Sequence, residues 1–203
     1  KSIGEFEIDP KRFDLSERDN NSLNMPDKVA AEETAEFLER MIAAQDSVGG
    51  VVECLVDGMP AGVGEPVFDK LDARLAGAIM SIGAVKGFEI GDGFAAAKAL
   101  GSQNNDEFYV DAYGKVNKKP NHAGGILGGM SDGSQIVLRA AFKPTPSIAQ
   151  LQKTANNHGE NVEIAIKGRH DPVVVPRAVV VVEAMTALTI VDLLLMGKNA
   201  KLD

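Results

Sequence analysis

The residues best suited to chemistry fall in the short run Gly168-Arg169-His170-Asp171-Pro172. Arg169 carries a planar guanidinium that can hold a carboxylate or phosphate through two parallel hydrogen bonds, and His170 and Asp171 can move protons. The run follows segment 161–167, whose alternating apolar and polar residues predict a half-buried strand. A structural ion pair between Arg169 and an acid elsewhere accounts for the same residues, so the run alone leaves both interpretations open.

Two further stretches have compositions suited to ligand contact. In Lys143-Pro144-Thr145-Pro146-Ser147, the prolines predict an extended path that leaves the backbone N–H groups and hydroxyls of Thr145 and Ser147 available. Residues 121–133 contain five glycines, without GxGxxG or GxxxxGK[ST] spacing. That glycine-rich stretch is as typical of a simple chain reversal as of a loop lying against a ligand.

The charge of the chain favours a small anionic ligand over nucleic acid. The formal net charge is −8, whereas a surface that follows phosphates needs clustered lysine and arginine. Residues 1–111 hold 22 acids and 10 bases, and residues 112–203 hold 7 acids and 11 bases, so the second part could concentrate positive potential in a cleft. Scattered solvated side chains explain Lys115, Lys118 and Lys119 well. That explanation fits poorly for four cations beside apolar strand-like runs, which are Arg139, Lys143, Lys167 and Arg169.

Hydrophobic periodicity predicts an α+β chain whose elements position these segments. One helix is predicted from Pro26 to before Gly49, and a second from Glu65 to about Ile82, with Gly83 as its cap. The predicted strands are 3–8, 51–56, 88–90, 135–142 and 161–167. The polar segment 101–119 predicts a mobile surface loop that could contain a hairpin around residues 112–114.

Residues 176–196 are apolar almost all round, with Glu183 and Asp192 as their only acids. An acid near a bilayer centre costs about 2.5 to 3.5 kcal/mol, so a fully buried core helix is favoured over a membrane span. Cys54 is interpreted as a reduced, buried thiol. Residues 1–8 lack signal-peptide features and the chain does not begin with Met, so we expect a cytoplasmic protein cut from a longer one. We expect no metal site.

Six motifs between Gly49 and Pro176 resemble, in order and approximate spacing, the chorismate synthase family. They are Gly49-Gly50-Val51-Val52-Glu53, Gly62-Val63-Gly64-Glu65-Pro66-Val67-Phe68-Asp69, Ser81-Ile82-Gly83-Ala84-Val85-Lys86-Gly87, Asn121-His122-Ala123-Gly124-Gly125-Ile126-Leu127-Gly128-Gly129, Lys143-Pro144-Thr145 and Gly168-Arg169-His170-Asp171-Pro172. Residues 1–25 match only loosely and are expected to form a loosely ordered N-terminal segment. Residues 26–203 resemble the C-terminal portion of the family's domain.

The resemblance implies a β-α-β sandwich that assembles as a homotetramer. It implies conversion of 5-enolpyruvylshikimate 3-phosphate to chorismate and phosphate by a 1,4-elimination in the shikimate pathway of aromatic amino acid biosynthesis. The cofactor implied is reduced FMN, which is thought to lend an electron as phosphate leaves, with no net redox change; NADP is also associated with the family.

The resemblance also assigns residues. The family's flavin contacts fall on Gly83, Ala84, Gly128, Lys143, Pro144, Thr145, Pro146, Ser147 and Arg169. Asp171 takes the position of an acid near the flavin, proposed to help the flavin N5 act as base. Arg169 and Lys143 are the fixed cations that an anionic substrate and flavin require, and they would favour the ionised form of Asp171.

Some positions depart from the family pattern. Gly83 stands where the family often carries Asn or Pro, and Asp132 where it often carries Asn, so a flavin contact at Gly83 can come only from backbone. Nothing resembles the family's histidine-containing N-terminal motifs, and His122, His158 and His170 receive neither catalytic role. We therefore expect the fragment alone to be inactive. A non-catalytic flavin- or anion-binding module and an oligomerisation fragment remain the alternatives.

Overall fold

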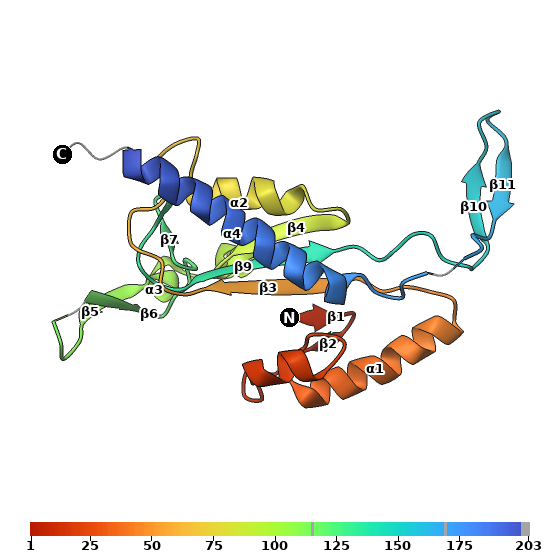
Figure 1. The fold of residues 1–203 in the computed structure, drawn as a ribbon, viewed down its shortest axis with the longest axis horizontal. Coiled ribbons are helices and arrows are strands. Elements are labelled where there is room, and N and C mark those ends of the chain that lie inside the picture. Colours follow the sequence, from red (N-terminus) through yellow and green to blue (C-terminus); the bar gives the residue numbers. More distant parts are fainter. Residues whose placement is uncertain (115, 169, 200–203) are drawn as a thin grey trace. The chain divides into compact units, whose positions relative to one another are not determined.

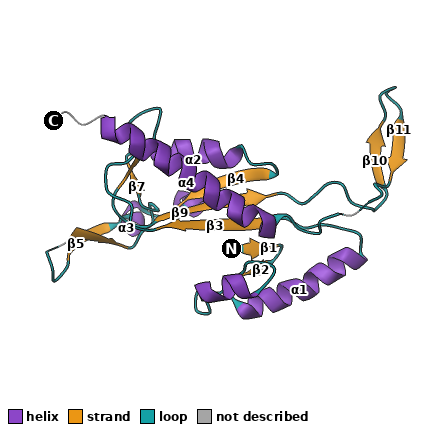
Figure 2. Cartoon of the chain, viewed as in Figure 1, coloured by secondary structure: helices purple, strands orange, loops and turns teal. Residues whose placement is uncertain are grey.

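The computed structural model describes residues 1–114, 116–168 and 170–199, and its helices and strands confirm the predicted α+β class (Figures 1 and 2). The chain divides into two compact units. The first comprises Lys1–Val52 and Ala141–Val179, and the second comprises Glu53–Ala140 and Val180–Asp203. Strands β3 (Gly50–Val56) and β9 (Ile136–Phe142) and helix α4 (Val175–Asn199) each run from one unit into the other.

The first unit begins with a small antiparallel sheet. Strand β1 (Ser2–Ile3) lies between β2 (Phe6–Glu7) and the start of β3. The paired residues are Ser2↔Glu7, Ile3↔Phe6, Ser2↔Val51 and Ile3↔Gly50. Segment 3–8, predicted as one edge strand, is therefore a tight hairpin, and Gly4 takes the left-handed backbone of its turn with φ 56°.

Helix α1 (Lys28–Ala43) follows the short 3-10 helix η1 (Leu15–Asn20). Its N-cap is Asp27, whose side chain accepts a hydrogen bond from the N–H of Ala30, so the helix begins after Pro26 rather than at it. The buried side of the helix presents Ala30, Ala31, Thr34 and Leu38.

A second hairpin in the first unit pairs β10 (Gln152–Ala155) with β11 (Asn161–Ile164) over four residues. The sequence predicted a half-buried strand at 161–167. That prediction is wrong about burial, because every residue of β11 is exposed, and β10 was not predicted. An alternating pattern indicates a strand, but the two strands here pair only with each other, so no layer covers their apolar side chains.

In the second unit, β3, β9 and β4 (Val85–Ile90) lie side by side in that order. Alternate residues of β9 point into the core, and helices α2 (Leu71–Met80) and α4 supply the rest of it. The buried side chains are Ile136, Leu138 and Ala140 of β9, Leu71, Leu75 and Ile79 of α2, and Val182, Thr186, Ile190 and Leu193 of α4. A hydrogen bond of 2.8 Å from Arg74 to Asp192 joins the two helices.

Two predictions for the second unit need correction. Helix α2 begins at Leu71 rather than at Glu65, because Val67 has a φ of 70° and cannot belong to a right-handed helix. Segment 101–119 is not one loop. It contains α3 (Gly101–Asn104) and strands β5 (Glu107–Val110) and β6 (Val116–Lys119), which confirm the hairpin around residues 112–114; η2 (Gly93–Lys98) precedes it.

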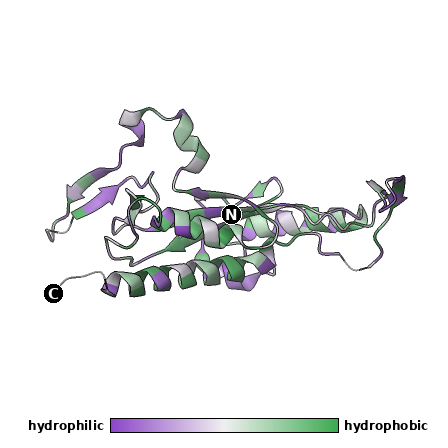
Figure 3. Ribbon diagram, turned by 90° about the horizontal axis from the view of Figure 1, so that it is seen from above, coloured by the Kyte–Doolittle hydropathy of each residue, from purple (hydrophilic) through white to green (hydrophobic). Residues whose placement is uncertain are grey.

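Helix α4 is not the fully buried helix that the sequence predicted. Its segment Val175–Lys198 is long and apolar enough to cross a membrane, but only 22% of the most apolar window is buried in the described structure. Hydrophobic residues recur along the helix in Figure 3. The exposed apolar side chains from Val180 onward are Val180, Val181, Leu188, Val191, Leu195 and Met196. One face of α4 packs on the core, and no part of the chain that the structure describes covers the other.

Candidate functional site

Segment 143–147 leaves the end of β9 in the first unit, as the two prolines predict. Lys143, Pro144 and Pro146 are exposed, and Thr145 and Ser147 are partly buried. The Thr145 carbonyl accepts a hydrogen bond of 2.6 Å from the Ser47 hydroxyl. The Thr145 hydroxyl oxygen is buried and has no hydrogen-bond partner among the described residues. Because a buried hydroxyl usually finds a partner, this atom is suited to a ligand.

The same short segment of chain holds the second chemical run in place. The N–H of Val48 donates to the carbonyl of Pro172 at 2.8 Å, and Val48 forms a bridge with Val173. Residues 47–48 therefore contact both segment 143–147 and segment 171–173. Ser47 is a site residue that sequence reasoning missed, because its partner lies 98 positions away.

Position 49 has no room for a side chain. A Cβ placed there would lie 2.3 Å from the carbonyl oxygen of Phe142 and 3.2 Å from the Pro144 ring. No side chain fits at that distance, so the close approach of residues 47–49 to segment 143–147 depends on Gly49.

Asp171 is partly exposed and pairs with Arg177, three residues into α4, at 2.8 Å; the two side chains are 33% and 73% exposed. Arg169 and Lys143 were predicted from the sequence as the cations for Asp171, and Arg177 was not. Arg169 lies outside the described residues. The ring Nε2 of His170 lies 3.0 Å from the Ile166 carbonyl, an arrangement in which Nε2 carries the proton and donates it.

In the second unit, Gly83 and Ala84 join the end of α2 to β4. The left-handed residue there is Ala84, with φ 71°, so the interpretation of Gly83 as the helix-capping glycine is wrong. A Cβ on Gly83 would meet nothing within 4 Å. The backbone at Gly83 is consequently open to a neighbouring molecule.

The glycine-rich stretch forms the small hairpin of β7 (Ile126–Leu127) and β8 (Met130–Ser131), with Gly128 in its turn at φ 62°. Close packing excludes a side chain at two other glycines of the stretch. A Cβ at Gly125 would lie 2.5 Å from the Gln135 carbonyl oxygen, and a Cβ at Gly129 would lie 2.4 Å from the Lys70 side chain. A Cβ at Gly128 would meet nothing within 4 Å.

Gly83 and Gly128 are not close neighbours in the second unit. The Leu71 N–H at the start of α2 donates to the Gly129 carbonyl at 2.7 Å, whereas Gly83 follows the other end of that helix. Ten helical residues span about 15 Å. A single ligand that touches both glycines of one chain must therefore extend along the helix.

Two of the cations in the positive second part of the chain are paired with carboxylates. Arg139 donates to Glu89 at 3.1 Å and to the Gly91 carbonyl, and lies 3.7 Å from Glu53. Lys118, interpreted as solvated, has a side chain only 1% exposed between two carboxylates. Lys143 and Lys167 are exposed. The described residues contain no group of three or more His, Cys, Asp or Glu side chains placed to hold a metal ion.

Comparisons with known proteins agree with the motifs. The family model described as chorismate synthase matches residues 1–195. Chorismate synthase of Lachnospira eligens is 62% identical over 203 residues, which is 100% of this chain and 55% of that protein. Chorismate synthase of Synechocystis is 49% identical over 197 residues, covering 96% of this chain and 54% of that protein.

A crystal structure of chorismate synthase is similar to the fold, with a TM-score of 0.77 and 32% sequence identity. It covers 97% of this chain, and the match covers 55% of the solved chain. This likeness confirms the predicted fold family. The chain spans about half the length of the relatives it matches.

Proposed function

Because the chain belongs to the chorismate synthase family, we propose that it is part of a carbon–oxygen lyase that converts 5-enolpyruvylshikimate 3-phosphate to chorismate and phosphate. The enzyme is cytoplasmic and homotetrameric and uses reduced FMN. Beyond the family, the proposal rests on the buried hydroxyl of Thr145, which has no partner among the described residues and lies in a segment held beside the Asp171 run by residues 47–48.

Each unit, taken by itself, has features that fit contact with a flavin. In the first unit, Thr145 has a buried hydroxyl without a partner among the described residues, and Lys143 has an exposed ammonium for an anionic group. In the second unit, Gly83 and Gly128 have open backbone. Ala84, Pro144, Pro146 and Ser147 complete the proposed set of contacts, together with Arg169, which lies outside the described residues. The bound cofactor supplies electron density that assists departure of the phosphate.

The 1,4-elimination breaks one C–O bond and one C–H bond. Phosphate leaves with the electron pair of the C–O bond, and the ring proton passes to a base. Lys143 stabilises negative charge on the ligands, and Asp171 holds or accepts a proton near the cofactor. The ion pair with Arg177 at 2.8 Å holds the Asp171 carboxylate in position for this role. The fragment supplies only these parts, and we expect no turnover from it alone.

Titration of the chain with reduced FMN under anaerobic conditions, followed by fluorescence, tests the site. We expect saturable quenching, and we expect phosphate release only after the remaining portion of a family enzyme is added. In such a reconstituted enzyme, Asp171→Asn should leave FMN affinity within about threefold and lower turnover sharply, because it removes a proton acceptor but no cofactor contact. Unaltered turnover in that variant would remove Asp171 from the mechanism.

Arg177→Gln is the matched control, because it removes the partner of Asp171 and leaves the carboxylate in place. We expect a smaller loss of turnover, because the carboxylate remains and loses only the side chain that holds it in position. A loss equal to that of Asp171→Asn would make the ion pair, rather than the carboxylate, the essential feature.

A non-catalytic oligomerisation fragment is the second candidate, and the uncovered apolar face of α4 is the observation that favours it. Under that proposal, a second copy of the chain covers the face through Val180, Leu188 and Val191. Sedimentation velocity, together with the FMN titration, distinguishes the two functions. Self-association without FMN binding favours the oligomerisation fragment, and FMN binding favours the part of a lyase.

A further inference from the structure

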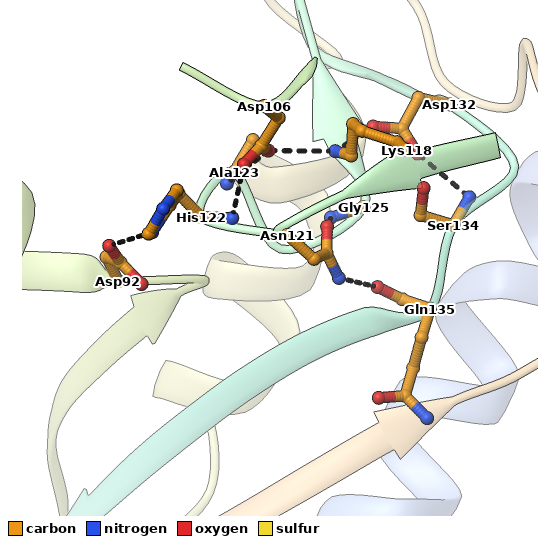
Figure 4. A network of polar contacts seen from close by, with 10 residues as sticks. All are labelled: Asp92, Asp106, Lys118, Asn121, His122, Ala123, Gly125, Asp132, Ser134 and Gln135. Carbon is orange, nitrogen blue, oxygen red and sulfur yellow. Dashed lines mark hydrogen bonds and ion pairs between the residues drawn. The ribbon is translucent and has the colours of Figure 1, made fainter. Parts of the chain in front are cut away.

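The glycine-rich stretch 121–133 is held near each end by a carboxylate (Figure 4). At its start, Asp106 accepts hydrogen bonds from the N–H of His122 at 2.7 Å and of Ala123 at 3.0 Å. At its end, Asp132 accepts from the N–H of Ser134 at 2.8 Å. The two carboxylates belong to parts of the chain 26 positions apart, and backbone contacts alone do not explain why they lie together.

Lys118 of β6 joins them. Its ammonium lies 3.0 Å from the Asp106 carboxylate and hydrogen-bonds the Asp132 carboxylate, with all three side chains less than 10% exposed. A buried ammonium is costly unless it is paired, and two buried carboxylates repel each other unless a cation separates them. Each charge in the cluster therefore requires the other two, which fixes β6 against both ends of the stretch.

The protonation states agree with this geometry. Burial alone would raise the pKa of Asp106 and of Asp132. For Asp106, hydrogen bonds from the N–H groups of Ala123 and His122 and the contact with Lys118 outweigh burial and lower the pKa. For Asp132, the contact with Lys118 and the hydrogen bonds from Ser134 outweigh burial and lower the pKa. Both carboxylates are ionised near neutral pH, as a shared ammonium needs.

We propose that Lys118 is a positioning residue for cofactor binding, which holds the two ends of the 121–133 stretch together and so fixes the backbone of Gly128. The proposal rests on the proposed function, because it takes Gly128 as a flavin contact. Lys118 is surrounded by its own carboxylates and does not itself bind the anionic cofactor. It acts through the shape of the turn, in which Gly128 is left-handed and open.

Two measurements on the intact 203-residue chain test this role. Hydrogen exchange followed by mass spectrometry reports on the peptide spanning 121–133, and anaerobic titration with reduced FMN reports on binding. We expect Lys118→Met to raise exchange of that peptide and to weaken FMN binding, each by roughly tenfold or more, because two buried carboxylates lose their shared cation. Lys118→Arg should restore both to within about threefold, since it keeps the charge.

Asp132→Asn is the second variant, in case Lys118→Met does not fold. It keeps the shape of the side chain and removes one of the two ion pairs, so we expect smaller changes in the same direction. Lys86→Met is the control, because Lys86 is an exposed lysine of β4, and it should change neither measurement.

Unchanged exchange of the 121–133 peptide in folded Lys118→Met or Asp132→Asn would overturn the proposal. Faster exchange with unchanged FMN affinity would also overturn it, because Lys118 would then be structural only. If the unmodified chain itself does not bind reduced FMN, the proposed flavin site fails and the cofactor part of this proposal fails with it. In that case, hydrogen exchange of the 121–133 peptide still shows whether Lys118 holds the two ends of the glycine-rich stretch together.

Discussion

Asp27 allows a quantitative test of how the first unit is stabilised. Its side chain is fully buried, accepts hydrogen bonds from the N–H groups of Asp9 at 3.0 Å and Ala30 at 3.2 Å, and lies 2.9 Å from Arg12. Burial alone would raise the pKa of Asp27, but the Arg12 hydrogen bond, the two backbone donors and the Arg12 charge lower it from 3.8 to about 2.

This lowered pKa makes stability depend on pH in a definite direction. A carboxyl group with a depressed folded-state pKa stabilises the fold above its unfolded-state pKa, and that stabilisation is lost as the pH falls from about 4 to about 2. At about 1.4 kcal/mol per pKa unit, the shift amounts to about 2.5 kcal/mol. Because the Arg12 side chain is 44% exposed, solvent screens part of its charge, and we expect about 1.5 to 2.5 kcal/mol.

The perturbation is Asp27→Asn, which keeps a capping oxygen for α1 and removes the charge. Urea unfolding followed by far-ultraviolet circular dichroism should show a loss of about 2 kcal/mol near pH 7 and almost no difference from the unmodified chain near pH 2. Asp9→Asn is the control: its carboxylate also reaches Arg12, at 3.1 Å, but is 35% exposed, so it should cost less than about 1 kcal/mol. An equal loss at both pH values for Asp27→Asn would refute the argument.

Gly128→Asn should lower the free energy of unfolding by about 1 kcal/mol or less, because Asn tolerates a left-handed backbone, yet it should weaken binding of reduced FMN in an anaerobic titration. Gly114→Asn is the control, because Gly114 is also left-handed, with φ 79°, and open; it should leave FMN binding unchanged. Leu188→Glu should reduce any self-association seen by sedimentation velocity, since Leu188 is 65% exposed on the uncovered face of α4. Cys54 should react with a disulfide reagent more slowly than free cysteine near pH 8, because burial and, to a smaller extent, the charge of Glu183 raise the pKa of its thiol; an equal rate would contradict this.

Local sequence patterns were sufficient to predict those helices and strands whose bounds are set by residues nearby in the sequence. Strand β9 was predicted almost to the residue, because its apolar side chains alternate and the prolines at 144 and 146 end it. The start of α2 could not be predicted in this way. The Glu65-Pro66 pair is a typical helix start, but the structure places Val67 in a left-handed turn and satisfies the first N–H of α2 from Gly129.

The burial of Lys118 shows the same limit for side chains. A lysine in a polar segment is usually solvated, and no local signal distinguishes Lys118 from Lys119. Its partners, Asp106 and Asp132, lie 12 and 14 positions away on either side and are brought together by the β5–β6 hairpin and the glycine-rich stretch. The prediction that α4 is fully buried was wrong for a related reason. Its composition indicates burial on all sides, but the burial of each side chain depends on which other elements pack against the helix.

The positive excess of residues 112–203 supported an anion site, and the structure restricts which residues can form it. Lys118 and Arg139 are held by carboxylates, so a ligand would have to compete with existing ion pairs to use their charge. Lys143 has no such competition from the contacts described and lies beside the orphan hydroxyl of Thr145 in the chain. A short segment with one exposed cation and one unpartnered hydroxyl can select an anion more sharply than a diffuse positive surface can. The positive excess therefore overstates the charge that an anionic ligand could use, because part of it serves to hold the fold.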